Sequence, residues 1–197
     1  MAIRKVAEAA LPTKFGTFRI IGFKDKLGNE SIIALVMGSP WNQPSPLVRI
    51  HSQCLTGENF SSSRCDCGDQ LEVALQRISE EGDGILIYQL AEGRGIGLMN
   101  KLLAYELQDS GHDTVEANHQ LGFEADVRSY TLCAEVLNEF DIRRIRLMSN
   151  NPRKLEALEK AGIEQVERVS IEIPPSHTTE HYLRTKKDKL GHLLREV

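Results

Sequence analysis

Short apolar runs rich in β-branched residues alternate along this chain with segments of helical periodicity, and that alternation restricts the possible folds to a few classes. The strongest run, Gly84-Ile-Leu-Ile-Tyr-Gln-Leu90, predicts a buried strand, and it follows a predicted helix at 70–81. Gly82 and Asp83 separate the two elements. We therefore expect an α/β or α+β fold with a mixed β-sheet flanked by helices.

Further strands and helices are predicted on both sides of this run. The predicted strands cover 16–22, 31–37, 46–50, 144–148 and 166–171, and the first two could form a hairpin across 25–29. Helices are predicted at 98–109, within 127–140, at 151–161 with Pro152 in the first turn, and from about Glu180. A chain of 197 residues has room for one domain or two small ones.

The composition argues against some classes of partner. Hydrophobic residues make up 41% of the chain and charged residues 26%, and the net charge is −4. Broad binding to nucleic-acid backbones needs a basic face, whereas a phosphorylated small molecule needs only a local cluster of Arg and Lys. No run approaches the roughly 18 apolar residues of a membrane span, and no long apolar run follows Met1-Ala-Ile-Arg-Lys5 as in a signal peptide. We expect a cytoplasmic protein with no nucleic-acid or membrane partner.

Three of the four cysteines, Cys54, Cys65 and Cys67, fall within fourteen positions among polar and small residues. Three thiolates suit a soft divalent ion such as Zn²⁺, and they leave one tetrahedral position open for chemistry. The spacing also permits a cluster of reduced thiols or a disulfide, although disulfides are uncommon in the cytoplasm. Cys133 lies in the apolar helical pattern of 130–137, which predicts an ordinary core thiol.

Three segments could bind phosphate. The glycines of Gly93-x-Gly95-x-Gly97 lie between a strand and a helix, where backbone N–H groups can approach an anion, and Arg94 lies among them. They could instead form only a turn, since the pattern is not a dinucleotide-binding fingerprint. The segment Ser149-Asn-Asn-Pro-Arg-Lys154 opens another helix, and Arg128 could bind an anion or only form a surface salt bridge with Asp126. The recurrence of such clusters favours a nucleotide ligand.

Five separated motifs and the tail then point to a family. They are Arg49-x-His-Ser-x-Cys-Leu-Thr-Gly57, Arg64-Cys-Asp-Cys-Gly68, Glu92-Gly-Arg-Gly-Ile-Gly-Leu98, Asp113-Thr-Val-Glu-Ala-Asn118, Asn150-Asn-Pro-x-Lys154 and Glu180-His-Tyr-Leu-x-Thr-Lys186. Because these motifs occur in this order, the chain resembles the GTP cyclohydrolase II family over about residues 5–194. The resemblance implies an enzyme that opens the imidazole ring of GTP, releases C8 as formate and removes pyrophosphate. The product, a diaminopyrimidine ribosylamino phosphate, begins riboflavin biosynthesis.

The resemblance also implies roles for individual residues. Cys54, Cys65 and Cys67 match the ligands of one zinc ion per chain. The positions that match GTP contacts are Arg49, Ile50, His51, Ser52, Gln53, Gln70, Glu92, Gly93, Arg94, Thr114, Ser149 and Lys154. Asp126 matches a proton acceptor, and Arg128 matches the proposed nucleophile toward the α-phosphorus. Electrostatic stabilisation is the competing role for Arg128, because guanidinium has a pKa above about 12.

The same resemblance implies the remaining expectations. Tyr105 matches an active-site tyrosine associated with hydrolysis of the formamide, although its helical spacing by itself predicts only a half-buried tyrosine. Mg²⁺ is expected with the GTP phosphates, and a homodimer is expected. We predict a single domain over residues 1–197, of which about 172–197 form a C-terminal tail and helix.

This sequence departs from the family pattern near the substrate positions. Gln53 stands where the family usually has Glu, Ala91 replaces Gln, Leu90 replaces a usually basic residue, Ser149 stands for Thr, and 173–178 lacks the Gly-Arg-Asn-Pro segment. The departures leave open a diverged paralogue that serves a secondary pathway or stops at a formamide intermediate. A non-catalytic regulator that binds zinc and nucleotide is a further alternative, against which the intact Tyr105, Asp126 and Arg128 argue.

Overall fold

The structure is a computed structural model that describes residues 3–197, and the chain divides into two compact units. The first unit consists of the chain up to His51, Leu71–Leu90 and Ser129–Ile171. The second unit consists of Ser52–Gln70, Ala91–Arg128 and Glu172–Val197. Each unit is assembled from three segments that are far apart in the sequence. The single domain predicted for residues 1–197 stays a prediction.

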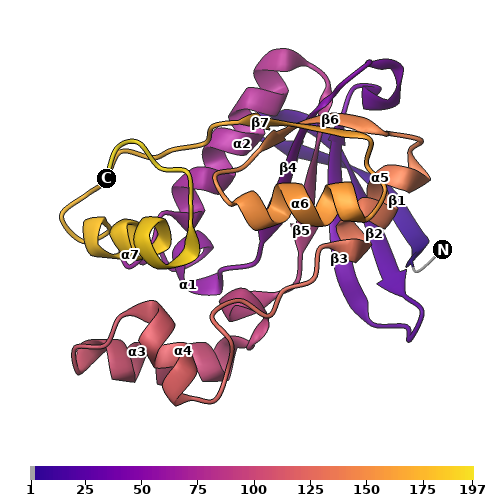
Figure 1. Cartoon of the computed structure of the whole chain (residues 1–197). Coiled ribbons are helices and arrows are strands. Elements are labelled where there is room, and N and C mark those ends of the chain that lie inside the picture. Colours follow the sequence, from indigo (N-terminus) through magenta and orange to yellow (C-terminus); the bar gives the residue numbers. More distant parts are fainter. Residues whose placement is uncertain (1–2) are drawn as a thin grey trace. The chain divides into compact units, whose positions relative to one another are not determined.

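A seven-stranded mixed sheet forms the centre of the first unit, in the order β1-β2-β3-β5-β4-β6-β7 (Figure 1). The strands are β1 (Ile3–Thr13), β2 (Gly16–Asp25), β3 (Glu30–Met37), β4 (Leu47–Ser52), β5 (Gly84–Gln89), β6 (Arg144–Met148) and β7 (Gln165–Val169). The pairs β1–β2, β2–β3 and β3–β5 are antiparallel, whereas β4–β6 and β6–β7 are parallel. The predicted α/β class with a mixed sheet is confirmed.

The predicted strands are all present, and the predicted hairpin across 25–29 joins β2 to β3. The strand β1 is missing from the prediction. It lies at the edge of the sheet, and Ile3 is the one buried residue in it. An edge strand of this kind lacks the apolar run or alternation by which buried strands are recognised in a sequence.

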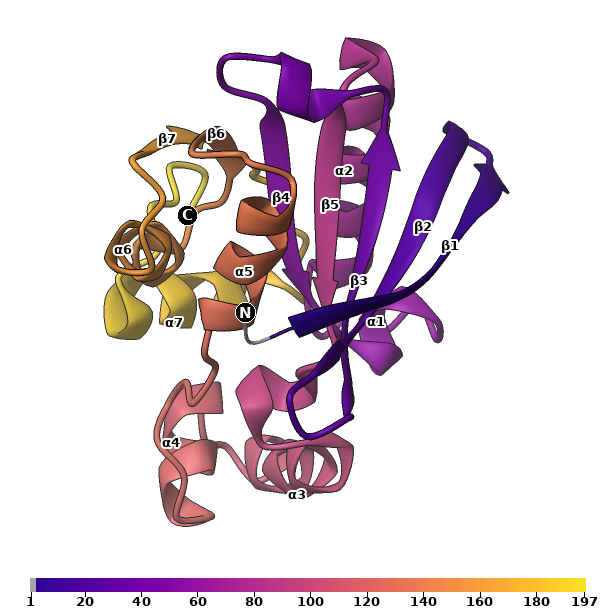
Figure 2. The ribbon, with the colours of Figure 1, turned by 90° about the vertical axis from the view of Figure 1, so that its right-hand side faces the viewer.

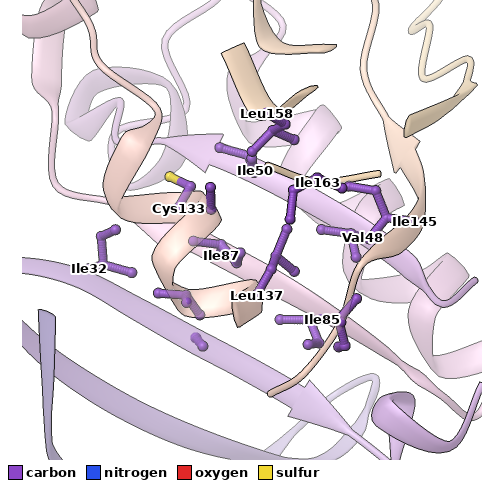
Figure 3. Close-up of a cluster of buried hydrophobic side chains, with 14 of the residues drawn as sticks. Ile32, Val48, Ile50, Ile85, Ile87, Cys133, Leu137, Ile145, Leu158 and Ile163 are labelled. Carbon is purple, nitrogen blue, oxygen red and sulfur yellow. The ribbon is translucent and has the colours of Figure 1, made fainter. Parts of the chain in front are cut away.

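Helices pack on both faces of the sheet. Those of the first unit are the short 3-10 helix η1 (Pro40–Asn42), α5 (Thr131–Glu139), α6 (Pro152–Lys160) and, from Leu71 onward, α2 (Cys67–Glu81). Residues of α5 and α6 form one buried cluster with Ile85 and Ile87 of β5 (Figure 3). Leu86 joins a second buried cluster with α2. Because successive side chains of a strand point to opposite faces, α2 covers one face, and α5 and α6 cover the other (Figure 2).

Two details of α5 and α6 agree with the sequence prediction. Cys133 is fully buried in the cluster of Figure 3, which confirms it as a core thiol. The helix α6 begins with Pro152, and the side chain of Asn151 before it accepts a hydrogen bond from the N–H of Arg153 at 3.0 Å.

The described elements of the second unit are helical. They are α1 (Leu55–Glu58), the start of α2, the 3-10 helix η2 (Glu92–Gly95), α3 (Leu98–Asp109), α4 (Thr114–Gln120) and α7 (Glu180–Leu190). The predicted helices at 98–109 and from about Glu180 are confirmed. The prediction misses α4, although Asp113 and Glu116 form a capping box at its start. No helix within residues 3–197 is long and apolar enough to cross a membrane.

The core of the first unit generates a prediction about stability. Leu137 of α5 is 0% exposed, so Leu137→Ala should lower the free energy of unfolding by about 2–5 kcal/mol through the cavity that it leaves. Urea denaturation followed by circular dichroism measures this loss. The control is Leu27→Ala, at a side chain that is 87% exposed, and it should change stability by less than about 0.5 kcal/mol. Equal losses in the two variants would contradict this description of the core.

Candidate functional site

Three sulfur atoms converge in the second unit. Cys54 precedes the first turn of α1, Cys65 lies in the loop before α2, and Cys67 is the first residue of α2. Their Sγ atoms all lie within 4.8 Å of one another, and those of Cys54 and Cys65 are 3.7 Å apart. All three cysteines are free, so the alternative of a disulfide is wrong.

The spacing of the sulfurs fits a metal site. A tetrahedral ion with Zn–S bonds of about 2.3 Å separates its sulfur ligands by about 3.8 Å. The backbone of Gly57 packs directly against the sulfurs, because a Cβ atom there would lie 2.9 Å from Cys65 Sγ and 3.3 Å from Cys54 Sγ. A Cβ atom at Gly68 would lie 2.6 Å from the carbonyl oxygen of Gly57. The two glycines therefore let the start of α2 approach the turn of α1 closely enough to bring the three thiols together.

The thiols share their charge unevenly. Hydrogen bonds from Cys65 and Cys67 lower the pKa of Cys54 far below its ordinary value, and the charge of Lys101 adds to this effect. The hydrogen bond with Cys54 raises the pKa of Cys65 to about 11. The pKa of Cys67 is also raised, by Cys54, Cys65 and burial. The cluster as a whole favours negative charge, which suits a bound cation.

A buried lysine stands beside the sulfurs. The ammonium of Lys101 in α3 donates to Cys54 Sγ at 3.2 Å, to Thr56 Oγ1 at 3.0 Å and to Glu92 Oε1 at 2.7 Å. These three acceptors match the three donors of an ammonium group. Burial opposes the charge, but the hydrogen bond with Glu92 and the charge of Cys54 outweigh it and raise the pKa of Lys101. Lys101 is therefore a permanent positive charge at the sulfur cluster.

Glu92 connects the glycine-rich loop with α1. Its Oε2 accepts from the N–H of Leu55 at 2.7 Å, and its Oε1 accepts from the N–H of Gly93 at 2.9 Å as well as from Lys101. The side chain of Glu92 is only 9% exposed. Both of its carboxylate oxygens are thus engaged inside the unit, where they hold the loop and the cysteine segment together.

Tyr105 also belongs to this network. Its hydroxyl and Thr56 Oγ1 form a hydrogen bond of 3.1 Å. Its ring lies under two cations, 4.7 Å from the guanidinium carbon of Arg64 and 5.6 Å from the Nζ of Lys101. Burial raises the pKa of the Tyr105 hydroxyl, which keeps it protonated and able to donate. The half-buried tyrosine expected from spacing is confirmed, with partners that the sequence does not indicate.

The glycine-rich loop has a strained conformation. Gly93, Arg94 and Gly95 all have positive φ angles, of 62°, 60° and 95°, and Arg94 is the one residue of the three for which this is costly. Its Nη1 donates to the carbonyl of Ala125 at 3.4 Å, and its carbonyl accepts from the N–H of Val127 at 3.2 Å. Its Nη2 is buried without a hydrogen-bond partner among residues 3–197. An unsatisfied guanidinium donor of this kind is suited to an anionic ligand.

Asp126 and Arg128 form a close pair. Arg128 donates through Nε to Asp126 Oδ1 at 2.8 Å and through Nη2 to Oδ2 at 2.6 Å, while its Nη1 donates to Ser52 Oγ at 3.1 Å. The side chain of Arg128 is 12% exposed and that of Asp126 is 7% exposed, so the alternative of a surface salt bridge is wrong. Burial opposes ionisation, but the hydrogen bond and charge of Arg128 hold the pKa of Asp126 below its usual value. Both groups are therefore charged.

Three further predicted residues of the second unit lie near these groups. Gln53 is half-buried and directly precedes Cys54. Gln70 donates its Nε2 to Asp66 Oδ2 at 2.6 Å. Thr114 lines a cavity of about 360 Å³, whose wall also includes Arg64, Gln108, His112, Tyr182 and Thr185.

Five predicted GTP contacts lie in the first unit, where Arg49, Ile50 and Lys154 are tied together across the parallel strands β4 and β6. Arg49 Nη1 donates to the carbonyl of Met148, and Lys154 Nζ donates to the carbonyl of Ile50, each at 2.8 Å. Arg49 and Lys154 are 5% exposed. The Nζ of Lys154 also lies 5.5 Å from the ring of Tyr130. Two cations are thus held in place beside the ends of two parallel strands.

The remaining two residues are His51 and Ser149. His51 stacks on Tyr88 with ring centroids 5.8 Å apart. The hydroxyl of Ser149 accepts from the N–H of Asn151 at 3.1 Å, in the turn that opens α6. The segment 149–154, which by its sequence could bind phosphate, therefore forms a capped turn at the start of a helix.

The sequence prediction gave no role to several residues that the structure joins to the sulfur cluster. Lys101 and Thr56 contact Cys54, and Lys186 pairs with Asp66 between two of the cysteines. Lys101 lies four positions before Tyr105, a spacing that places both on one helical face, and this spacing is a usable signal. Lys186 belongs to the tail motif, but nothing in the local sequence indicates that it pairs with Asp66, 120 residues away.

Comparison with known proteins gives consistent matches. A family model described as GTP cyclohydrolase II matches residues 4–170. A GTP cyclohydrolase-2 from Enterobacter sp. (strain 638) is 54% identical over 196 residues, which is 100% of both chains. A GTP cyclohydrolase-2 from Escherichia coli O9:H4 (strain HS) is 52% identical over 194 residues, which is 98% of this chain and 99% of that protein.

A solved structure is similar in fold. It is a two-domain 3,4-dihydroxy-2-butanone 4-phosphate synthase from A. baumannii, with a TM-score of 0.52 and 18% sequence identity. The match covers 87% of this chain and 41% of that one. At this identity the likeness concerns the fold alone.

The sulfur cluster generates a prediction about metal. Replacing Cys54, Cys65 or Cys67 by Ser should reduce bound zinc from about one ion per chain to near zero, because a hard hydroxyl is a poor substitute for a thiolate. Elemental analysis of the purified protein measures zinc per chain. Cys133→Ser is the matched control and should keep its zinc, since Cys133 lies in the core of the first unit. Coordination by four sulfurs that included Cys133 would overturn the assignment.

Proposed function

Because this chain belongs to the GTP cyclohydrolase II family, we propose that it hydrolyses GTP to formate, pyrophosphate and a diaminopyrimidine ribosylamino phosphate, as the first step of riboflavin biosynthesis. The observation that supports this reaction best is the cluster of Cys54, Cys65 and Cys67, with its hydrogen bonds to Lys101 and its link to Tyr105 through Thr56. Hydrolysis of a ring C–N bond is assisted by a Lewis acid and by groups that hold protons beside it. The three cysteines could hold a metal ion that acts as the Lewis acid, and Lys101 and Tyr105 would hold protons next to it.

The three cysteines would hold one zinc ion per chain. Zinc bound there would act as a Lewis acid with one coordination position left open by its three protein ligands. Lys101 balances the excess negative charge of the thiolates, and the Tyr105 hydroxyl holds a proton next to the cluster. Mg²⁺ would accompany the GTP phosphates. The family resemblance further supports a cytoplasmic homodimer.

Arg128 would bind the α-phosphate as a charged group. The bidentate hydrogen bonds with Asp126 keep its guanidinium protonated and fix its orientation. To act as a nucleophile, Arg128 would have to lose a proton to Asp126, whose pKa is held below its usual value. The geometry therefore favours electrostatic stabilisation over nucleophilic attack.

The proposed GTP contacts are Arg49, Ile50, His51, Ser52, Gln53, Gln70, Glu92, Gly93, Arg94, Thr114, Ser149 and Lys154. Among them, Arg94 has a buried donor without a partner in the described chain, which suits a phosphate oxygen. Glu92 differs, because Lys101 and two backbone N–H groups already occupy its carboxylate. Glu92 would therefore also position the loop, so that the backbone of Gly93 and Arg94 meets the nucleotide.

The proposal is tested by incubating the purified protein with GTP and Mg²⁺ and identifying the products by mass. Arg128→Ala should lose both pyrophosphate release and ring opening, by about 10²–10³-fold, while zinc stays bound. Tyr105→Phe should release pyrophosphate normally and form formate poorly, because the hydroxyl lies next to the sulfur cluster. Arg143→Ala removes an exposed arginine and should behave as the wild type. An Arg128→Ala protein with near wild-type turnover would exclude that residue from the reaction.

Gln53 generates a second prediction, about the departure closest to the cysteines. A Glu there could accept a proton, whereas Gln keeps the size and the carbonyl but cannot ionise. Because general-base help is typically worth ~10²–10⁴-fold, a slow enzyme or an accumulating formamide intermediate is expected. Gln53→Glu should raise turnover or advance the product, with little change in zinc content. If the wild type already makes formate at ordinary rates and Gln53→Glu changes nothing, the case for a diverged paralogue fails.

A further inference from the structure

The tail motif Glu180-His-Tyr-Leu-x-Thr-Lys186 has no part in the reaction proposed above, yet it reaches the cysteine loop of the second unit. The Nζ of Lys186 in α7 donates to Asp66 Oδ1 at 3.0 Å. Asp66 lies between Cys65 and Cys67, two of the three candidate zinc ligands. The side chains of Lys186 and Asp66 are 12% and 3% exposed, so the ion pair is largely removed from water.

Asp66 sets the path of the chain between the two cysteines. Its Oδ1 accepts from Lys186, and its Oδ2 accepts from Gln70 Nε2 at 2.6 Å. Its backbone carbonyl accepts from the N–H of Gln70 at 3.0 Å, which forms the first turn of α2. This turn places Cys67 at the start of the helix and Cys65 just before it. A carboxylate buried at such a position needs a cationic partner, because an unpaired buried charge is strongly unfavourable.

The helix α7 is anchored so that it can supply this partner. The ring of Tyr182, one turn before Lys186, lies 4.5 Å from the Nζ of Lys186. Lys189, in the next turn, forms ion pairs with Asp113 and Glu116 at the start of α4. The helix is therefore held at two points, the cysteine loop and the capping box of α4.

We propose that Lys186 is a positioning residue for the metal centre, and that its ion pair with Asp66 holds the Cys65–Cys67 turn in the geometry that binds zinc. The tail of the chain thereby becomes part of the metal site without supplying a ligand to it. This proposal rests on the zinc site of the proposed function but not on the reaction with GTP. A protein that binds zinc and does not convert GTP would overturn the proposed function and leave this inference standing.

The test measures zinc affinity on the full chain, without GTP, by competition with a chromogenic chelator. Lys186→Met should weaken zinc binding by about 10–100-fold, the range found when groups that orient metal ligands are removed. Lys187→Met is the matched control, because it removes the same charge at the next position of α7, from a side chain that donates to the carbonyl of Val197. Its zinc affinity should equal that of the wild type.

A double variant separates the ion pair from a general loss of folding. In Asp66→Asn/Lys186→Met the buried charge is gone together with its partner, so the variant should fold, but its zinc affinity should stay reduced because the ion pair that holds the turn is absent. Circular dichroism of the zinc-free proteins shows whether each variant is folded. If Lys186→Met does not fold, a folded double variant with weakened zinc binding supports the proposal. Wild-type zinc affinity in a folded Lys186→Met or in the folded double variant, or an equal loss in Lys187→Met, would overturn it.

Discussion

The electrostatics of three closely spaced sulfur atoms organise the second unit. Three thiolates and one Zn²⁺ sum to −1, since 3 × (−1) + 2 = −1. Such a centre is stable inside a protein only if nearby cations and hydrogen-bond donors compensate for its charge. Lys101 hydrogen-bonds to Cys54 directly, and Lys186 neutralises the carboxylate of Asp66 between Cys65 and Cys67. The burial of both lysines follows from this requirement.

The same arrangement recurs at three cations of the second unit. Lys101 is paired with Glu92, Arg128 with Asp126, and Lys186 with Asp66. In each pair the carboxylate also bonds to the backbone or to another side chain, so it fixes a loop as well as a charge. A cation held in this way keeps both its proton and its direction, which is what phosphate binding and charge compensation require.

The sheet of the first unit determines where the functional segments begin. Ser52–Gln70 begins at the last residue of β4, and Ala91–Arg128 begins just after β5. Loops at strand ends can carry unusual backbone conformations because the strands themselves are fixed by the core. The positive φ angle of Arg94 and the close approach of Gly57 to two sulfurs are examples. The glycine-rich loop and two of the three cysteines, Cys54 and Cys65, thus lie in irregular segments next to regular elements.

Much of this structure could be predicted from the chain. Buried strands such as β5 and amphipathic helices such as α3 have a periodicity that shows their type and length. The edge strand β1 and the short helix α4 were missed, because one is mostly exposed and the other is only seven residues long. The cysteine cluster was predictable because its ligands lie within fourteen positions and a turn can bring them together.

The sequence by itself determined the types of most elements, the three cysteines of the cluster, and the residue types available to bind an anion. Only the tertiary structure decided that Lys101 is bonded to Cys54, that Asp126 holds Arg128 by two hydrogen bonds, and that Lys186 meets Asp66. The physical reason is that hydrophobic burial repeats with the period of a helix or strand, whereas the pairing of buried charges has no period. The pairing of a lysine with a carboxylate 120 positions away leaves no pattern in the local sequence. It can be recognised only in the folded chain, where both groups are buried together.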